Sequence, residues 1–183
     1  MVPRAHRAPR DALSSAVTPP AISIREAGPG DVEVMAGMRL ALESEGGSNV
    51  AEDPGFRRAV DAWFSEHVGT EGFRAWVAED ADGHVVGFGG LVLISRPPYT
   101  HNPSGIEGLV TSMYTLPERR REGIGASILR AMLAAAREAG AGRLVLYSSK
   151  GAESLYRRFG FTGDVERGAR LHRWLEPADR SDP

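Results

Sequence analysis

A glycine-containing loop that follows three arginines is the segment of this chain best suited to bind a phosphate group. Arg119, Arg120 and Arg121 precede Gly123 and Gly125, after which an apolar helical stripe begins. Glycines let a ligand approach the backbone closely, and the free N–H groups at a helix N-terminus attract an anion. Arginine adds charge-assisted hydrogen bonds to phosphate oxygens. The loop therefore predicts a phosphate cradle, with a tight turn beside a solvated basic patch as the alternative.

Two other kinds of phosphate loop are excluded by the residues present. A Rossmann fingerprint needs a third Gly or Ala at position 128, which is occupied by Ile128. A P-loop ends in Gly-Lys-Ser or Gly-Lys-Thr, and the chain contains no such tripeptide. The loop therefore belongs to another family of phosphate cradles.

The composition narrows the chemistry further. The 183 residues include no cysteine, which removes disulfides, thiolate metal sites and a cysteine nucleophile. The five histidines show no metal-ligand spacing, so we expect no metal. A net charge of −2 argues against a nucleic-acid partner held by bulk positive charge. No apolar run approaches the roughly 18 residues that a membrane span needs, and we expect a cytoplasmic protein.

The elements that must position the loop follow from periodicity and turn residues. The first half is expected to contain strand 22–27, a helix over 31–42 that Asp31 caps, an acidic loop over 43–55 and a helix over 56–67 that buries Val60, Trp63 and Phe64. A hairpin follows, with strand 73–79, turn 80–83 and strand 85–94. The second half is expected to contain strand 106–116, a helix after residue 125 that ends at Gly140, strand 144–147, helix 152–159 and a last strand around Leu171 and Trp174. This order predicts a mixed α/β fold with a largely antiparallel front half. The short apolar run 144–147 is typical of a buried parallel strand. We expect a disordered N-terminal tail over 1–20, a domain over 21–177 and a C-terminal tail over 178–183.

Two blocks of the sequence match a known pattern. Arg120, Gly123 and Gly125 fit the motif Gln/Arg-x-x-Gly-x-Gly/Ala, and the stretch from Ala152 to Phe161 fits Ala-x-x-Leu-Tyr-x-x-x-Gly-Phe. One helix and one strand separate them, and the segment 113–117 resembles the strand that precedes the first motif. Over residues 106–163 the chain resembles the GNAT superfamily of acetyl-CoA-dependent N-acetyltransferases. The resemblance implies a single α/β domain whose mostly antiparallel sheet is flanked by helices and whose fourth and fifth strands splay apart.

The resemblance also implies acetyl-CoA as co-substrate and assigns its parts to this chain. The CoA pyrophosphate would lie on the backbone of the loop, at Arg120, Arg121, Glu122, Gly123, Ile124, Gly125 and Ala126. The pantetheine arm would pair with the backbone of Met113, Tyr114 and Thr115, which would polarise the thioester carbonyl. The family often has Asn where this chain has Ser149, whose hydroxyl can also hydrogen-bond a pantetheine amide.

The same resemblance suggests the catalytic groups. Tyr156 matches a tyrosine that the family keeps near the thioester sulfur, where a phenol could protonate the departing thiolate; a plain core residue is the alternative. Glu107 lies in the strand that often supplies a base, and a solvated carboxylate is the equal alternative. Glu43 and Glu45 are rival bases and candidate substrate-binding residues, because the loop after the first helix usually borders the acceptor site.

We therefore expect an N-acetyltransferase that moves an acetyl group from acetyl-CoA to a small cationic amine. The absence of cysteine excludes an acetyl-cysteine intermediate, so the amine would attack the thioester directly in a ternary complex. The alternatives are a non-catalytic acyl-CoA-binding module and an enzyme that acetylates protein N-termini or lysines. The expected partner is a small-molecule amine, with neither nucleic acid nor membrane, and a homodimer is compatible with this reading.

Overall fold

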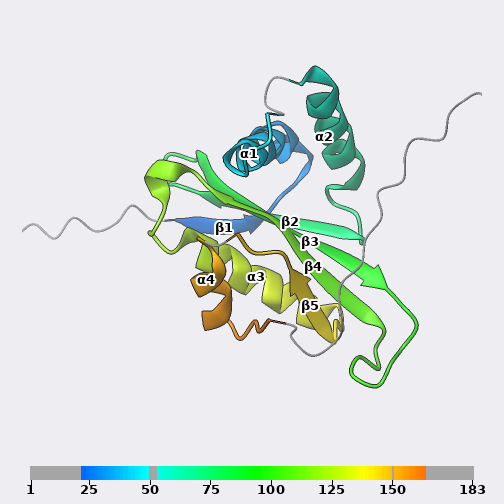
Figure 1. The fold of residues 1–183 in the computed structure, drawn as a ribbon. Coiled ribbons are helices and arrows are strands. Elements are labelled where there is room, and N and C mark those ends of the chain that lie inside the picture. Colours follow the sequence, from blue (N-terminus) through cyan, green and yellow to red (C-terminus); the bar gives the residue numbers. More distant parts are fainter. Residues whose placement is uncertain (1–21, 50–52, 150, 164–183) are drawn as a thin grey trace, which may run out of the picture. The chain divides into compact units, whose positions relative to one another are not determined.

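A five-stranded sheet with the order β1-β2-β3-β4-β5 frames the protein in a computed structural model (Figure 1). Its strands are β1 Ser23–Glu26, β2 Phe73–Glu79, β3 Val85–Ser95, β4 Ile106–Thr115 and β5 Arg143–Leu146. Each of the first four strands pairs antiparallel with its neighbour, whereas β4 and β5 are parallel. Adjacent strands can be antiparallel where short turns connect them, but β4 and β5 need a crossover, which a helix supplies. The mixed, largely antiparallel α/β fold that the sequence predicts is confirmed.

The structure describes residues 22–49, 53–149 and 151–163. The expected last strand and both expected tails lie outside these residues. Within them the chain forms two compact units, one that ends at Tyr147 and one that begins at Ser148. No helix in the described part of the chain is both long enough and apolar enough to cross a membrane.

Helices cover both faces of the sheet in the first unit. The short η1 Pro29–Asp31 leads into α1 Val32–Glu45 and then α2 Pro54–His67, and Figure 1 shows α1 and α2 on one face and α3 Ile124–Glu138 on the other. Another 3-10 turn, η2 Pro117–Arg119, precedes α3. In the second unit, α4 covers Glu153–Arg158. The apolar stripe expected in α3 is confirmed, because Ile128, Leu129 and Met132 are completely buried.

The core between α1, α2 and the sheet is aromatic at its centre. Phe64 of α2 meets Phe88 of β3 edge to face, with ring centroids 6.1 Å apart. The expectation that Trp63 is buried beside Phe64 is wrong, since Trp63 is 39% exposed. Its ring stacks on His67 at 4.3 Å and meets the buried Phe73 edge-on at 4.8 Å, so Trp63 lies at the margin of the core. One helical turn separates Trp63 from His67, so both side chains lie on the same face of α2, next to the face that buries Phe64.

The acidic segment 43–55 is partly helical, not a loop throughout. α1 continues to Glu45, and Ser44 Oγ donates to Leu40 O at 2.9 Å within its last turn. α2 already begins at Pro54, where Asp53 caps the helix by accepting from Gly55 N at 2.7 Å. Proline suits the first position of a helix because its missing N–H has no partner there. Glu43 and Glu45 are thus held on a helix.

Candidate functional site

A bulge interrupts β4 opposite the glycine-rich middle of β3. Two residues of β4, Ser112 and Met113, face the single residue Gly89, and Ser112 has a left-handed φ of 55°. A bulge takes backbone groups out of the ladder between strands, so they can hydrogen-bond elsewhere. A Cβ at Gly89 would lie 2.5 Å from Met113 Sδ, and glycine therefore permits this close packing.

The pairing between β4 and β5 stops before β4 ends. The last matched residues are Val110 and Leu146, yet β4 continues to Thr115. Over 111–115, the side of β4 that would face β5 has no strand partner within the described residues. An unpaired strand edge offers N–H and C=O groups to an extended ligand. Bulge and open edge coincide, and both lie where the pantetheine arm is expected.

The N-terminus of α3 is open to an anion. Its N-cap residue, Gly123, has a φ of 84° and provides no side chain to cap the helix. The first turn closes only when Ser127 N donates to Gly123 O at 3.0 Å, so the N–H groups of Ile124, Gly125 and Ala126 have no acceptor within the helix. The positive end of the helix dipole adds to the attraction. This is the geometry that the cradle prediction requires.

The three consecutive arginines have different surroundings. Arg119 is largely buried and binds Glu122 at 3.0 Å, and it also reaches Asp80 of the β2–β3 turn at 3.4 Å. These carboxylates raise the pKa of the Arg119 guanidinium, with Glu122 the larger cause. Arg121 is exposed, and no hydrogen bond or ion pair engages it within the described residues. Arg121 is thus the arginine of this run whose charge is uncompensated.

Arg120 joins the loop to α1 through Glu45. Its Nη2 lies 2.7 and 2.8 Å from the two carboxylate oxygens of Glu45, and its Nε donates to Thr115 O at 3.0 Å. The Tyr114 hydroxyl donates to the same carboxylate at 3.1 Å, and the Arg120 guanidinium lies 5.5 Å from the Tyr114 ring centroid. Burial, followed by the bond to Glu45, raises the pKa of Tyr114. The three side chains form one connected cluster between the loop and the α1 face of the sheet.

The described carboxylates of the segment 43–55, which the sequence predicts as an acidic loop, are compensated by other groups. Glu43 forms an ion pair with Arg39 one turn earlier on α1. Glu45 is bound as above, and Asp53 caps α2, while Glu52 lies outside the described residues. Glu43 and Glu45 are therefore not free charges that face an acceptor.

Glu107 lies at the start of β4, distant from the loop. Its side chain is only 8% exposed, and its two oxygens lie 3.2 Å from Arg96 Nη2 and 3.8 Å from Arg143 Nη1. Six residues of extended strand separate it from Met113, which corresponds to roughly 20 Å. The expected alternative of a solvated carboxylate is wrong, because Glu107 is buried between two arginines. Its role as the base stays a prediction.

The second unit contains the other two expected site residues. Tyr156 is buried in α4, with its ring edge-on to Phe161 at 5.9 Å, and burial raises its pKa. Ser149 is exposed, and its carbonyl accepts from Ala152 N at 3.1 Å. A phenol with a raised pKa keeps its proton at neutral pH, as a general acid must. The roles of both residues stay predictions.

A cavity of about 610 Å³ adjoins the Tyr114 cluster on the α1 side. Tyr114 and Leu116 of the β4 end, Glu33 and Gly37 of α1 and Arg57 of α2 contribute to its walls. This volume is within the range of about 300–1,000 Å³ that is common for small-molecule sites. Neither Glu33 nor Arg57 was expected as a site residue from the sequence.

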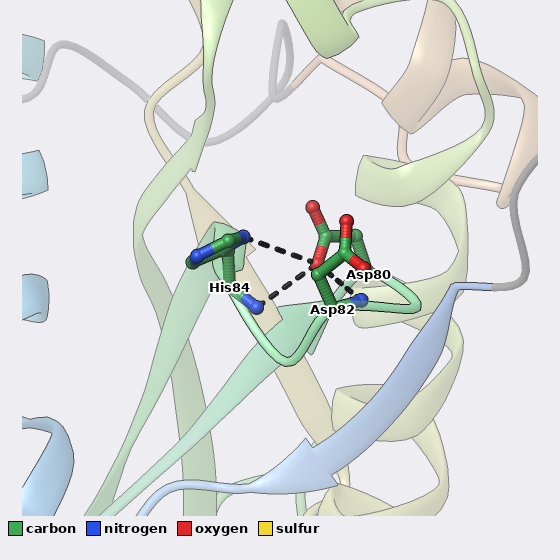
Figure 2. A group of neighbouring side chains, drawn as sticks. All are labelled: Asp80, Asp82 and His84. Atoms are coloured by element: carbon green, nitrogen blue, oxygen red, sulfur yellow. Dashed lines mark hydrogen bonds and ion pairs between the residues drawn. The ribbon is translucent and has the colours of Figure 1, made fainter.

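Asp80, Asp82 and His84 gather at the β2–β3 turn (Figure 2). Asp80 Oδ1 accepts from the backbone N–H of Asp82 at 3.0 Å and of His84 at 2.9 Å. These bonds, that of His84 first, hold the pKa of Asp80 below its ordinary value. The contacts are those of an Asx-type turn, and through Arg119 they attach the turn to the loop.

A mixed sheet with a bulged, open β4 beside an uncapped helix N-terminus is the arrangement expected of an acyl-CoA-dependent acyltransferase. The family model for the acetyltransferase (GNAT) domain matches residues 71–163, and the chain belongs to this family. The enzyme is thus an acyltransferase. No curated protein matches the chain by sequence.

Solved structures share this fold at low sequence identity. A predicted acetyltransferase with acetyl-CoA from Clostridium acetobutylicum is 23% identical with a TM-score of 0.72, covering 86% of this chain and 96% of its own. A GCN5-related N-acetyltransferase from Ralstonia eutropha JMP134 is also 23% identical with a TM-score of 0.72, covering 82% and 99%. The aminoglycoside N-acetyltransferase AAC(6')-Iy in complex with CoA is 18% identical with a TM-score of 0.65, covering 87% and 97%.

Proposed function

We propose that the protein transfers the acetyl group of acetyl-CoA to a primary amine on a small molecule. The observation that carries the proposal is the juxtaposition of the open, bulged β4 with the uncapped N-terminus of α3. In this proposal the open edge of β4 binds an extended amide chain, and the N-terminus of α3 binds a pyrophosphate. CoA contains both of these parts.

The loop holds the pyrophosphate in this proposal. The N–H groups of Ile124, Gly125 and Ala126 donate to it, and the glycine backbone at 123 permits the close approach. Arg121 supplies the uncompensated positive charge. Arg120 and Glu122 contribute their backbone, since their side chains are bound to Glu45 and Arg119.

The chemistry takes place beside the bulge. The pantetheine arm pairs with the backbone of Met113, Tyr114 and Thr115, and a bulge N–H stabilises the oxyanion of the tetrahedral intermediate. The neutral amine attacks the thioester carbonyl carbon, so that a C–N bond forms and the C–S bond breaks. The sulfur keeps the electron pair of the broken bond. From the family motif we assign Tyr156 to give its phenolic proton to that thiolate and Ser149 to hydrogen-bond the pantetheine, and the amine nitrogen releases its proton to water.

A direct base role for Glu107 fits the geometry poorly. Arg96 and Arg143 flank its carboxylate, and an extended strand separates it from the bulge. Both carboxylate oxygens already face guanidinium groups, which limits the access of an amine to them. Water at the reaction centre is the preferred proton acceptor, with Glu107 as the alternative.

A small-molecule acceptor is preferred over a protein N-terminus or lysine because a hollow of about 610 Å³, a volume common for small-molecule sites, adjoins the cluster. The structural neighbour AAC(6')-Iy, named an aminoglycoside N-acetyltransferase, is compatible with such an acceptor. The deciding experiment follows thiol release from acetyl-CoA across a panel of amines. Amine-dependent thiol and an acetylated amine by mass spectrometry are expected. CoA binding without either product with any amine would identify the alternative, a binding module.

A further inference from the structure

The cavity beside α1 has one uncompensated negative charge. Glu33 is the single carboxylate in its wall, it is exposed, and no hydrogen bond or ion pair engages it within the described residues. The other charged residue of the wall, Arg57, donates through Nε to the Asp61 oxygens at 3.2 and 3.0 Å. The cavity can thus stabilise one cationic group, and its described wall has no second carboxylate for another.

The other side chains of the wall are mostly apolar. Val34, Met38 and Ala41 line it from α1, and Val85 and Leu116 from the sheet. Such side chains favour a ligand with an apolar body. A polycationic amine is disfavoured, because the wall has one carboxylate for its ammonium groups.

Gly37 leaves space for that ligand body. It lies mid-helix in the cavity wall, and no atom lies within 4 Å of the position that a Cβ would occupy there. A glycine inside a helix costs about 0.5–1 kcal/mol relative to alanine. The sequence thus retains an unfavourable helix residue where a side chain would narrow the cavity.

The cavity is next to the proposed reaction centre. The Tyr114 ring forms part of its wall, and Tyr114 directly follows the bulge residues Ser112 and Met113. A ligand against Tyr114 is therefore close to the backbone that would hold the thioester. The cavity lies along α1 itself, not at the segment after it where the sequence placed the acceptor.

We infer that this cavity is the acceptor site and that Glu33 anchors the ammonium group of a monoamine with an apolar body. The inference rests on the proposed acetyl transfer and specifies its substrate class. The bound ammonium ion pairs with Glu33, and Val34, Met38 and Leu116 enclose the hydrocarbon part. The amine reacts after it releases a proton and turns toward the bulge.

Calorimetric titration of 2-phenylethylamine into the CoA complex tests the site without turnover. Binding is expected for the wild-type protein and about fivefold to thirtyfold weaker for Glu33→Gln, since a charged hydrogen bond at an exposed site is lost. Glu66→Gln on α2 is the matched control, because it removes one exposed carboxylate outside the cavity wall. Equal binding by the wild type and Glu33→Gln, or no binding by the wild type, overturns the inference.

Steady-state thiol release then compares 2-phenylethylamine, spermidine and kanamycin. The monoamine is expected to have the highest kcat/KM, and Glu33→Gln is expected to raise its KM about tenfold with an unchanged KM for acetyl-CoA. A higher kcat/KM for spermidine or kanamycin overturns the monoamine class and leaves acetyl transfer intact. Glu33-dependent binding without thiol release from any amine supports the site and contradicts the proposed activity, so the two failures are distinguishable.

Gly37→Leu provides a second perturbation of the same wall. Leucine is a better helix former than glycine, so α1 should be no less stable, yet the new side chain enters the cavity. Binding of 2-phenylethylamine is expected to fall at least about tenfold, because Leu fills the space for its ring. CoA affinity should stay the same. Unchanged amine affinity in a folded Gly37→Leu protein would place the acceptor elsewhere.

Discussion

Arg121→Ala tests the distribution of charge in the loop most directly. Of the three consecutive arginines, Arg119 and Arg120 are bound to carboxylates, whereas Arg121 has no partner within the described residues. A charge-assisted hydrogen bond contributes about 1.5–3 kcal/mol. Because Arg121 is exposed, screening should reduce this to about 1–2 kcal/mol. Since about 1.4 kcal/mol corresponds to tenfold in affinity, we expect CoA binding to weaken about fivefold to thirtyfold.

Isothermal titration calorimetry with CoA measures this loss. Arg137→Ala is the control, because it removes an exposed arginine from the opposite end of α3 and should leave the affinity unchanged. The difference between wild type and Arg121→Ala should shrink at high salt, since screening weakens exposed charges. Dephospho-CoA, which lacks the 3′-phosphate, tests which phosphate Arg121 contacts. If Arg121 contacts the pyrophosphate, Arg121→Ala weakens the binding of dephospho-CoA by the same factor as that of CoA. A larger loss for Arg119→Ala than for Arg121→Ala would refute the assignment.

Three further perturbations test other parts of the site. Glu45→Gln should tighten CoA binding about threefold to tenfold by calorimetry, because it removes a negative charge beside the cradle and releases Arg120; weaker binding would mean that Glu45 positions Arg120 for the ligand. Gly89→Ala should lower the free energy of unfolding in urea by about 1–3 kcal/mol, because the added methyl group overlaps Met113 Sδ; an unchanged midpoint would contradict the close packing at the bulge. Tyr156→Phe should lower kcat with little change in CoA affinity if Tyr156 is the acid. Burial raises the pKa of this phenol, so its contribution to stability is complete below pH about 10 and is lost as pH rises further. Thermal unfolding between pH 8 and 11 should therefore decline less steeply for Tyr156→Phe, and equal slopes would exclude this contribution.

Local patterns predicted most of the elements. The hairpin of β2 and β3 follows from alternation around the turn at Asp80 and Gly83, and the α3 stripe from its helical spacing. The segment 43–55 was mispredicted because Glu, Ser and Gly resemble a loop locally. An ion pair between Glu43 and Arg39 and the Asp53 cap extend helices into it. Helical spacing indicates which face of α2 is buried but not how wide that face is, so Trp63 was assigned to the core.

Some features of the site could be predicted from the sequence and others could not, because the latter depend on contacts that form only in the folded structure. The backbone cradle could be inferred because a glycine loop before a helix creates free N–H groups whatever surrounds it. The bulge had no sequence signal, since Ser112 adopts a left-handed φ that glycine or asparagine usually takes. Glu33 was not singled out because an exposed carboxylate near the start of a helix is ordinary in sequence.

The sequence by itself therefore determined the order of elements, the glycine loop before a helix and the absence of a cysteine nucleophile, because these depend on residues close together in the chain or on residue types. Only the tertiary structure decided which charges remain free. Glu45 meets Arg120 across 75 residues, and Asp80 meets Arg119 across 39. Such pairs form when distant elements pack, so a list of acidic and basic residues does not reveal them. Among the described residues of the loop 119–125 and of the cavity wall, Arg121 and Glu33 are the charged side chains that no ion pair compensates.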